Sequence, residues 1–172
     1  ALIKCKVDNE LRYVPYEQAY EVVNESISSF IDKKGFIDEL ITEGVLSKSL
    51  FWKEADDYEE GVYLAYERFE DHLTVQYLLE QYPELEKDFK ENGKLYKYVE
   101  NENSIYRYKG LIEAFSIQIP EIKGYEFYSL IPDLKDKYPI VESFVESLLW
   151  RKVDTINEES KKYVNEHVLS YQ

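Results

Sequence analysis

The chain has few of the residues that catalysis, metal binding and phosphate binding usually require. Its 172 residues include one cysteine, two histidines, six glycines and no methionine. A phosphate-binding P-loop needs two glycines separated by four residues and followed by Lys and Ser or Thr. No pair among the six glycines has that separation. This chain by itself therefore has no standard nucleotide cradle.

The single cysteine, Cys5, excludes an internal disulfide and is typical of a reducing compartment. It stands between Lys4 and Lys6, cations of the kind that lower a thiol pKa, but no catalytic sequence surrounds it. No stretch approaches the ~20 consecutive apolar residues that span a bilayer, and no basic region leads into an apolar signal core. We therefore expect a cytoplasmic protein with no catalytic residue and no membrane partner.

Positive charge is also scarce. Lys and Arg number 21 against 35 Asp and Glu, which gives a net charge of -14. Such a surface repels a phosphate backbone, so we expect no nucleic-acid partner. The 17 tyrosines lack a basic groove in which to stack bases. We expect rings such as those of Tyr106 and Tyr125 to pack with their hydroxyls in water, and an exposed aromatic patch to suit a protein interface.

The two ends of the sequence predict a piece of a longer protein, and a naturally methionine-poor protein with ragged termini is the alternative. The chain contains no methionine, opens at Ala1 and stops at Gln172. Gln172 falls within an amphipathic pattern at helical spacing, formed by Tyr163, Val164, His167, Val168 and Tyr171.

Two helices and a hairpin are predicted in the first half. Residues 16–30 carry apolar side chains at helical spacing, and Pro15 suits the first turn. Residues 36–46 repeat the pattern, and Gly44 is placed for a left-handed cap. The apolar positions of the two helices are Ala19, Val22, Val23, Ile27 and Phe30, then Phe36, Ile37, Leu40, Ile41 and Leu46.

The pattern then changes from helix to strand. Leu50, Phe51 and Trp52 form an apolar run, residues 54–61 form an acidic turn, and residues 62–66 are rich in strand-favouring types. Two helices, a hairpin and a further helix are the order of a winged helix. An all-α array with an incidental β-ribbon remains the alternative.

The second half is predicted to be helical. Helical spacing recurs in the segments 68–82, 83–91, 104–119, 125–131, 138–151 and 155–171, with breaks at Gly93, Asn101–Asn103, Pro120, Gly124, Pro132 and Pro139. Thr155 and Glu158 predict a capping box at the start of the last helix. We therefore expect a mainly α fold with a winged-helix-like module, residues 1–82, followed by a helical module, residues 83–172.

Polar side chains near the start of the helix predicted from Arg68 are the candidate site. Glu67, Asp71 and His72 lie within about two turns, but strong metal motifs have more ligands, so we interpret them as a solvated or salt-bridged helix start. Arg68, His72 and Gln76 recur every four residues and project from one side. They offer donors to an anionic ligand or a facing domain, although an ordinary polar flank has the same spacing.

The segment that contains these residues resembles a known family. Residues 62–73, Val-Tyr-Leu-Ala-Tyr-Glu-Arg-Phe-Glu-Asp-His-Leu, are similar to the segment that follows the nucleotide-binding core in bacterial STAND (NACHT-like) ATPases, including antiviral ones. Further similarity runs through residues 40–46, 108–115, 119–121 and 144–151.

The resemblance implies a regulatory, non-catalytic segment. The winged helix and the start of a helical arm would close over the nucleotide-binding domain of the same polypeptide and hold the ATPase inactive. His72 would be the sensor of the nucleotide phosphates, with Arg68 beside it. ATP or ADP would bind the parent protein, whose P-loop would precede Ala1.

Two other functions compete with this one. An acidic adaptor would use the tyrosine-rich helices to dock on other protein surfaces and would need no ATPase. A winged-helix transcription factor would need a basic recognition helix, whereas residues 36–46 contain Asp38, Glu39 and Glu43 and no Lys or Arg.

Overall fold

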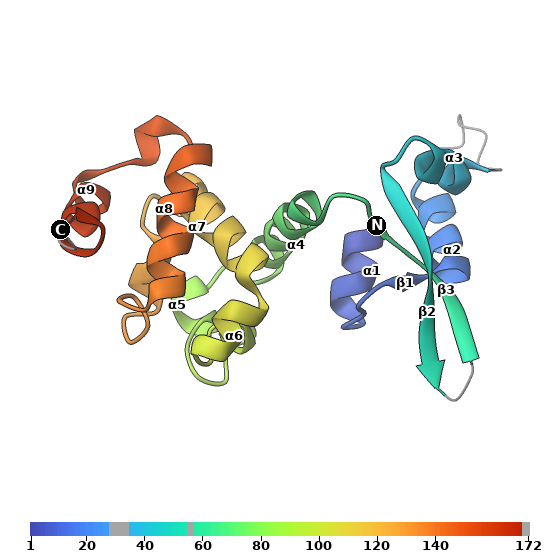
Figure 1. The fold of residues 1–172 in the computed structure, drawn as a ribbon, viewed down its shortest axis with the longest axis horizontal. Helices are drawn as coiled ribbons and strands as arrows, with labels where there is room; N and C mark the ends of the chain where they lie inside the picture. The colour runs from blue at the N-terminus through green and yellow to red at the C-terminus, as the bar shows by residue number, and fades with distance from the viewer. Residues whose placement is uncertain (28–34, 55–56, 170–172) are drawn as a thin grey trace. The chain divides into compact units, whose positions relative to one another are not determined.

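The computed structural model describes residues 1–27, 35–54 and 57–169 (Figure 1). Packing divides the chain into two compact units, Ala1–Thr74 and Val75–Gln172, and the division falls inside helix α4 (Glu67–Gln81). The expected boundary at residue 82 lies just after this helix. The predicted fold class is confirmed, because the described residues are mainly helical and one small antiparallel sheet contains the predicted hairpin.

The first unit has the element order of a winged helix. Two helices precede a long hairpin, and a short strand before them joins the same sheet. The strands lie in the order β1-β3-β2, and each pair of neighbours is antiparallel. The elements are α1 (Leu2–Asp8), β1 (Val14–Pro15), α2 (Tyr16–Ser26), α3 (Phe36–Thr42), β2 (Leu46–Glu54) and β3 (Asp57–Leu64).

One face of the sheet and the inner faces of the helices form the core of this unit. Each element contributes one buried side chain or more, and together these are Cys5, Val14, Ala19, Ile37, Leu46 and Val62. On the opposite face of the sheet, the rings of Tyr13 and Phe51 stack with centroids 3.8 Å apart. They cover Gly61, where a Cβ would lie 2.2 Å from a ring carbon of Tyr13. Glycine is therefore required at this close approach.

The structure corrects several sequence-based predictions for this unit. Neither α1 nor β1 was expected. Helix α2 ends at Ser26, so Ile27 is extended, and Phe30 lies outside the described residues. Gly44 does adopt the left-handed conformation, and Leu46 therefore belongs to β2 rather than to the preceding helix.

The predicted acidic turn is mostly strand. Strand β3 begins at Asp57, directly opposite Glu54. Two of its acidic residues face lysines of β2: Glu59 lies 2.5 Å from Lys53 and Glu60 lies 3.4 Å from Lys48. These cross-strand pairs offset the repulsion that would disfavour an acidic strand.

The second unit consists of the rest of α4 and a series of helices. The long helices α7 and α8 run side by side in the same direction, because ion pairs join Lys109 to Glu142 near their starts and Lys152 to Glu121 near their ends. The elements are α5 (Leu85–Asp88), η1 (Tyr96–Tyr98), α6 (Glu102–Arg107), α7 (Lys109–Lys123), η2 (Phe127–Leu130), α8 (Tyr138–Trp150), η3 (Val153–Thr155) and α9 (Glu158–His167).

Aromatic rings fill much of this second core. The Phe115 ring lies 5.2 Å from that of Phe89 and 5.7 Å from that of Phe127, measured between centroids. The rings of Tyr128 and Tyr163 stack at 4.0 Å. Burial raises the pKa of both tyrosine hydroxyls, which donate hydrogen bonds to backbone carbonyls. These tyrosines therefore stabilise the core, whereas Tyr106 is half exposed.

Several helix boundaries differ from the predictions for the second unit: the segment 104–119 is divided between α6 and α7, and the segment 125–131 forms only the short 3-10 helix η2. Pro120 was expected to break a helix but lies inside α7, which continues to a left-handed cap at Gly124. Loss of one backbone hydrogen bond is offset by burial of the surrounding face. Helix α9 begins two residues later than predicted, because Asn157 and Ser160, rather than Thr155 and Glu158, form the capping box. Tyr171 lies outside the described residues.

A buried ion pair joins the last helices. The guanidinium of Arg151 donates to both carboxylate oxygens of Glu126, at 2.7 and 2.8 Å, and to the hydroxyl of Ser160 at 3.3 Å. Ser160 also donates to Glu126 and accepts from the backbone N–H of Asn157 at 3.1 Å. Arg151 and Glu126 are 4% and 1% exposed. The capping box of α9 is thus tied to the end of α8 and the start of η2.

Glu126→Gln should destabilise the second unit by about 3–5 kcal/mol, because it leaves the Arg151 charge buried without a counter-ion. The double variant Glu126→Leu with Arg151→Met should recover most of that loss. Urea unfolding followed by Trp150 fluorescence in a Trp52→Phe background reports this unit alone, since the chain has 2 tryptophans, one in each unit. A double variant as unstable as the single one would contradict the prediction.

Candidate functional site

The predicted site residues lie on the first turns of α4. Arg68 is exposed and His72 is half-buried, both within the first unit, and Gln76 is exposed and lies 3.3 Å from Glu80. Glu67 and Glu70 occupy the first turn, where carboxylates are favourable near the positive end of the helix dipole. Arg68 and His72 are four residues apart and lie in one regular helix, as expected.

Glu70 anchors this helix start to the winged helix. One of its carboxylate oxygens accepts a hydrogen bond from the backbone N–H of Leu64 at 3.0 Å, and the other pairs with the Lys6 ammonium. Burial lowers the pKa of Lys6, and the carboxylates of Asp71 and Glu67 partly offset that effect. Glu70 thus joins α1, the end of β3 and α4.

Glu70 was not among the predicted site residues. The signal was an acidic residue in a first helical turn directly after a strand, a position from which a carboxylate reaches back to backbone N–H groups. Within the described ranges, the structure brings together no group of three His, Cys, Asp or Glu side chains in a metal-binding arrangement.

Cys5 is a core residue with a raised thiol pKa. Burial is the main cause, and a contact with Asn9 at 3.9 Å acts in the opposite direction. The neighbouring lysines do not lower the pKa as their position in the sequence suggests, because Lys4 pairs with Asp8 at 2.7 Å and Lys6 pairs with Glu70. A raised pKa and burial leave little reactive thiolate at neutral pH.

Helix α3 occupies the position of a recognition helix, the second helix of a helix-turn-helix. Its first turn carries Asp38 and Glu39, and its last turn has no basic residue. The Tyr16 hydroxyl donates to Asp38 at 2.8 Å, which raises the pKa of Tyr16 to about 12. This surface is acidic and would repel a phosphate backbone.

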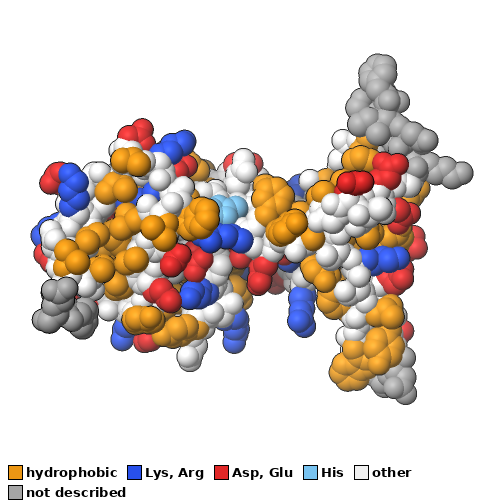
Figure 2. Space-filling view, turned by 45° about the horizontal axis from the view of Figure 1, so that its top comes forward, with side chains coloured by type: hydrophobic (Ala, Val, Ile, Leu, Met, Phe, Trp, Pro, Cys, Tyr) orange, Lys and Arg blue, Asp and Glu red, His pale blue; other side chains and the backbone are white. Residues whose placement is uncertain are grey.

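The hairpin presents apolar side chains to solvent. Leu50, Trp52 and Tyr58 are 67%, 66% and 60% exposed. They share a face, because Leu50 and Trp52 are two residues apart and Trp52 lies directly opposite Tyr58. Figure 2 shows hydrophobic side chains gathered along the hairpin near its end. We call these three residues the wing patch.

The wing patch has a geometric cause. It continues the face that carries Leu46 and Val62 in the core, but the strands run on beyond the helices that cover those residues. Sequence reasoning interpreted the apolar run at Leu50 as strand without expecting it to be exposed. The length of the hairpin could have indicated this exposure, because long strands extend past a small core.

Comparisons of the chain with known protein families, with curated proteins and with solved structures find no match. No helix within residues 1–27, 35–54 and 57–169 has the length and apolar content required to cross a membrane. The first unit thus presents an acidic helix, an apolar wing and an anchored helix start with Arg68 and His72. These groups can bind a partner surface or an anion.

Iodoacetamide should alkylate native Cys5 at least about tenfold more slowly than urea-unfolded chain at pH 8, because the thiol is buried. Since the folded pKa is the higher one, unfolding releases a proton above the pKa of the unfolded thiol, and stability should fall as pH rises through that interval. Mass spectrometry of quenched samples measures the rate. Equal rates in the two states would contradict a buried thiol.

Proposed function

We propose that this chain is the regulatory winged-helix and helical segment of a STAND-type ATPase, possessing no catalytic role of its own. It clamps the nucleotide-binding domain of the same polypeptide in an inactive state, in antiviral defence. The observation that carries the proposal is a winged helix whose exposed surfaces are acidic and apolar and whose last strand leads into α4 through residues 62–73, the segment that resembles this ATPase family.

A DNA-binding role is poorly supported by the same surfaces. A recognition helix enters the major groove with side chains that donate to bases and phosphates. Asp38 and Glu39 on α3 would instead meet phosphates with like charge. On the hairpin, the lysines at 48 and 53 already pair with Glu60 and Glu59.

The wing patch supplies the contact that a clamp requires. Exposed Leu50, Trp52 and Tyr58 form an aromatic-rich surface of the type found at the centres of protein interfaces. A contact with a neighbouring domain of the same chain needs little intrinsic affinity, because the effective concentration of a tethered domain is high. Such a contact is strong enough to hold a resting state and weak enough to be released.

Arg68 and His72 supply the link to nucleotide. In the proposed mechanism they contact nucleotide phosphates in only one of the two arrangements of the clamp. A ligand shifts a two-state equilibrium by its differential affinity for the two states, so this contact couples nucleotide identity to the clamp. Glu70 holds the same helix turn against α1 and β3, which keeps both side chains in register with the winged helix.

An acidic adaptor is the second candidate. It is favoured by the wing patch together with the net charge of -14, which would steer the chain to a basic partner. The adaptor requires no nucleotide, so nucleotide-dependent behaviour distinguishes the two functions.

In the full-length parent, His72→Ala and Arg68→Ala should each weaken retention of ADP by about tenfold to a hundredfold, the usual worth of a charge-assisted hydrogen bond. Basal ATP hydrolysis should rise as the clamp loosens. Gln81→Ala, at an exposed position at the end of α4 and outside this set of side chains, is the matched control and should leave both unchanged. Unchanged nucleotide retention and unchanged basal ATPase activity in the His72 and Arg68 variants would remove the sensor assignment.

The double variant Leu50→Ser with Trp52→Ser should raise basal ATPase activity of the parent severalfold, because it removes the apolar contact that holds the resting state. Thermal unfolding should change little, since both side chains are exposed. Tyr20→Ser, which alters an exposed ring on α2, is the control. If basal activity stays at the level of the control, the wing patch is not the clamp surface.

A further inference from the structure

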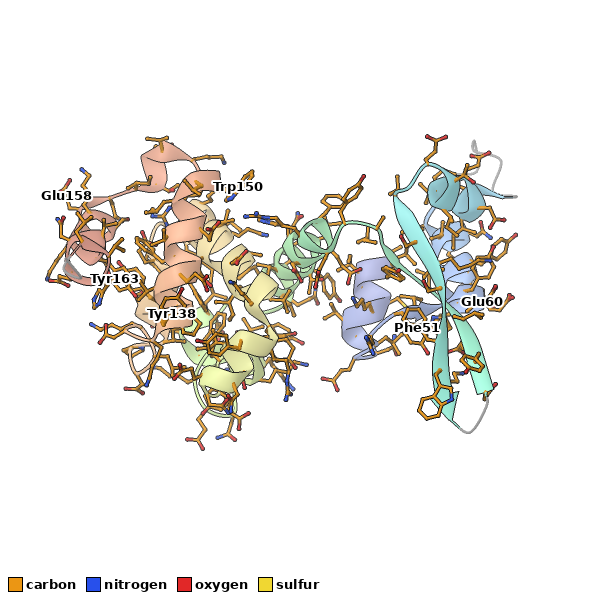
Figure 3. All side chains as sticks on the ribbon, in the orientation of Figure 1. Phe51, Glu60, Tyr138, Trp150, Glu158 and Tyr163 are labelled. Carbon is orange, nitrogen blue, oxygen red and sulfur yellow. The ribbon has the colours of Figure 1, made fainter. Side chains whose placement is uncertain are left out.

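A groove between α8 and α9 has an apolar floor and is not used by the functions above. It lies within the second unit and has a volume of about 510 Å³. Figure 3 labels Tyr138 at the start of α8 and Tyr163 on α9, the two helices that form its walls. Its floor consists of Val141 and Val145 from α8 and Val168 from the end of α9.

Helix α8 has two apolar faces, and only one of them is covered. Ile140 and Phe144 point into the core with Ser143 and Ser147. A second stripe at helical spacing lines the groove, and it consists of Tyr138, Val141, Glu142, Val145 and Glu146. An apolar stripe bordered by acidic residues is the complement of an amphipathic helix or extended segment that carries basic residues.

Negative charge surrounds the floor. Asp136, Glu142 and Glu146 line the groove, and its described lining contains neither Lys nor Arg. Glu142 already pairs with Lys109 at 3.0 Å, and Asp136 faces the His167 ring at 3.4 Å. Glu146 makes no hydrogen bond or ion pair with any residue that the structure describes. One half-buried carboxylate beside an apolar floor is therefore available to a cation.

We propose that this groove binds a Lys- or Arg-bearing apolar segment of a protein partner. An aliphatic side chain of the partner rests on Val141 and Val145, and an ammonium or guanidinium pairs with Glu146. The acidic rim favours a cationic partner, because it would repel an anionic ligand. A second copy of this chain also has a net charge of -14 and would be repelled by the first. This binding needs no ATPase, so its failure would leave the proposed clamp untouched.

Fluorescence anisotropy with the intact chain tests the proposal. The probe is a labelled amphipathic peptide of leucine and lysine, and the matched probe has glutamate in place of every lysine. The lysine peptide should bind and the glutamate peptide should not. Glu146→Lys should weaken binding of the lysine peptide by about tenfold or more, because it replaces attraction with repulsion beside the anchor. Asp154→Lys makes the same change of net charge at an exposed site outside the groove and should change the affinity by less than about twofold.

A second variant tests the apolar floor. Val145→Thr keeps the shape of the side chain but replaces a methyl group with a hydroxyl. The midpoint of thermal unfolding should stay within a few degrees. The affinity for the lysine peptide should fall severalfold, because the floor becomes less apolar. If Asp154→Lys lowers the affinity for the lysine peptide as much as Glu146→Lys does, the peptide is attracted by the net negative charge of the chain and not by the groove. That result would overturn the proposal. A concentration-dependent dimer in sedimentation, lost in Val145→Thr, would overturn it in favour of a second copy.

Discussion

The buried pair of Arg151 and Glu126 is the interaction on which the second unit depends. Removing two charges from water is costly, and here the cost is offset by bidentate geometry and by the Ser160 hydroxyl. Because Ser160 is also the third residue of α9 and completes its capping box with Asn157, the same network fixes where α9 begins. The wall of the groove that carries Val168 is therefore positioned by a polar interaction rather than by apolar packing alone.

A smaller network has the same role in the first unit. Glu70 satisfies a backbone N–H at the end of β3 and pairs with a lysine of α1, so α4 starts at a defined place against the winged helix. In each unit a carboxylate thus sets the position of a helix start. The surfaces that these helices and the hairpin leave exposed are acidic and apolar, which is the common physical basis for proposing protein partners at both the wing patch and the groove.

Local patterns predict the elements that have enough length to show a period. Helix α4, the hairpin and helix α8 follow from spacing within a single segment, and Gly44 marks a boundary because few other residues adopt its conformation. Arg68 and His72 fall on the first turns of α4 for the same reason. The sequence therefore predicts the fold class and the place of these two residues.

The elements that were missed depend on distant contacts. Strand β1 has only two residues and exists through its pairing with β3, so no local period reveals it. Arg151 and Glu126 are 25 residues apart, and nothing near either residue indicates the other. Pro120 is a helix breaker in isolation, but tertiary packing around α7 outweighs one lost hydrogen bond. The groove, likewise, exists only once α9 is docked beside α8.

The central claim is that a winged helix of this kind works as part of a nucleotide-binding polypeptide. The most direct measurement is to read the coding sequence upstream of Ala1. The account predicts an in-frame G-x-x-x-x-G-K-[ST] that follows a strand-forming segment. A start codon immediately before Ala1, with no such motif, would contradict it and would leave the acidic adaptor as the function that the surfaces support.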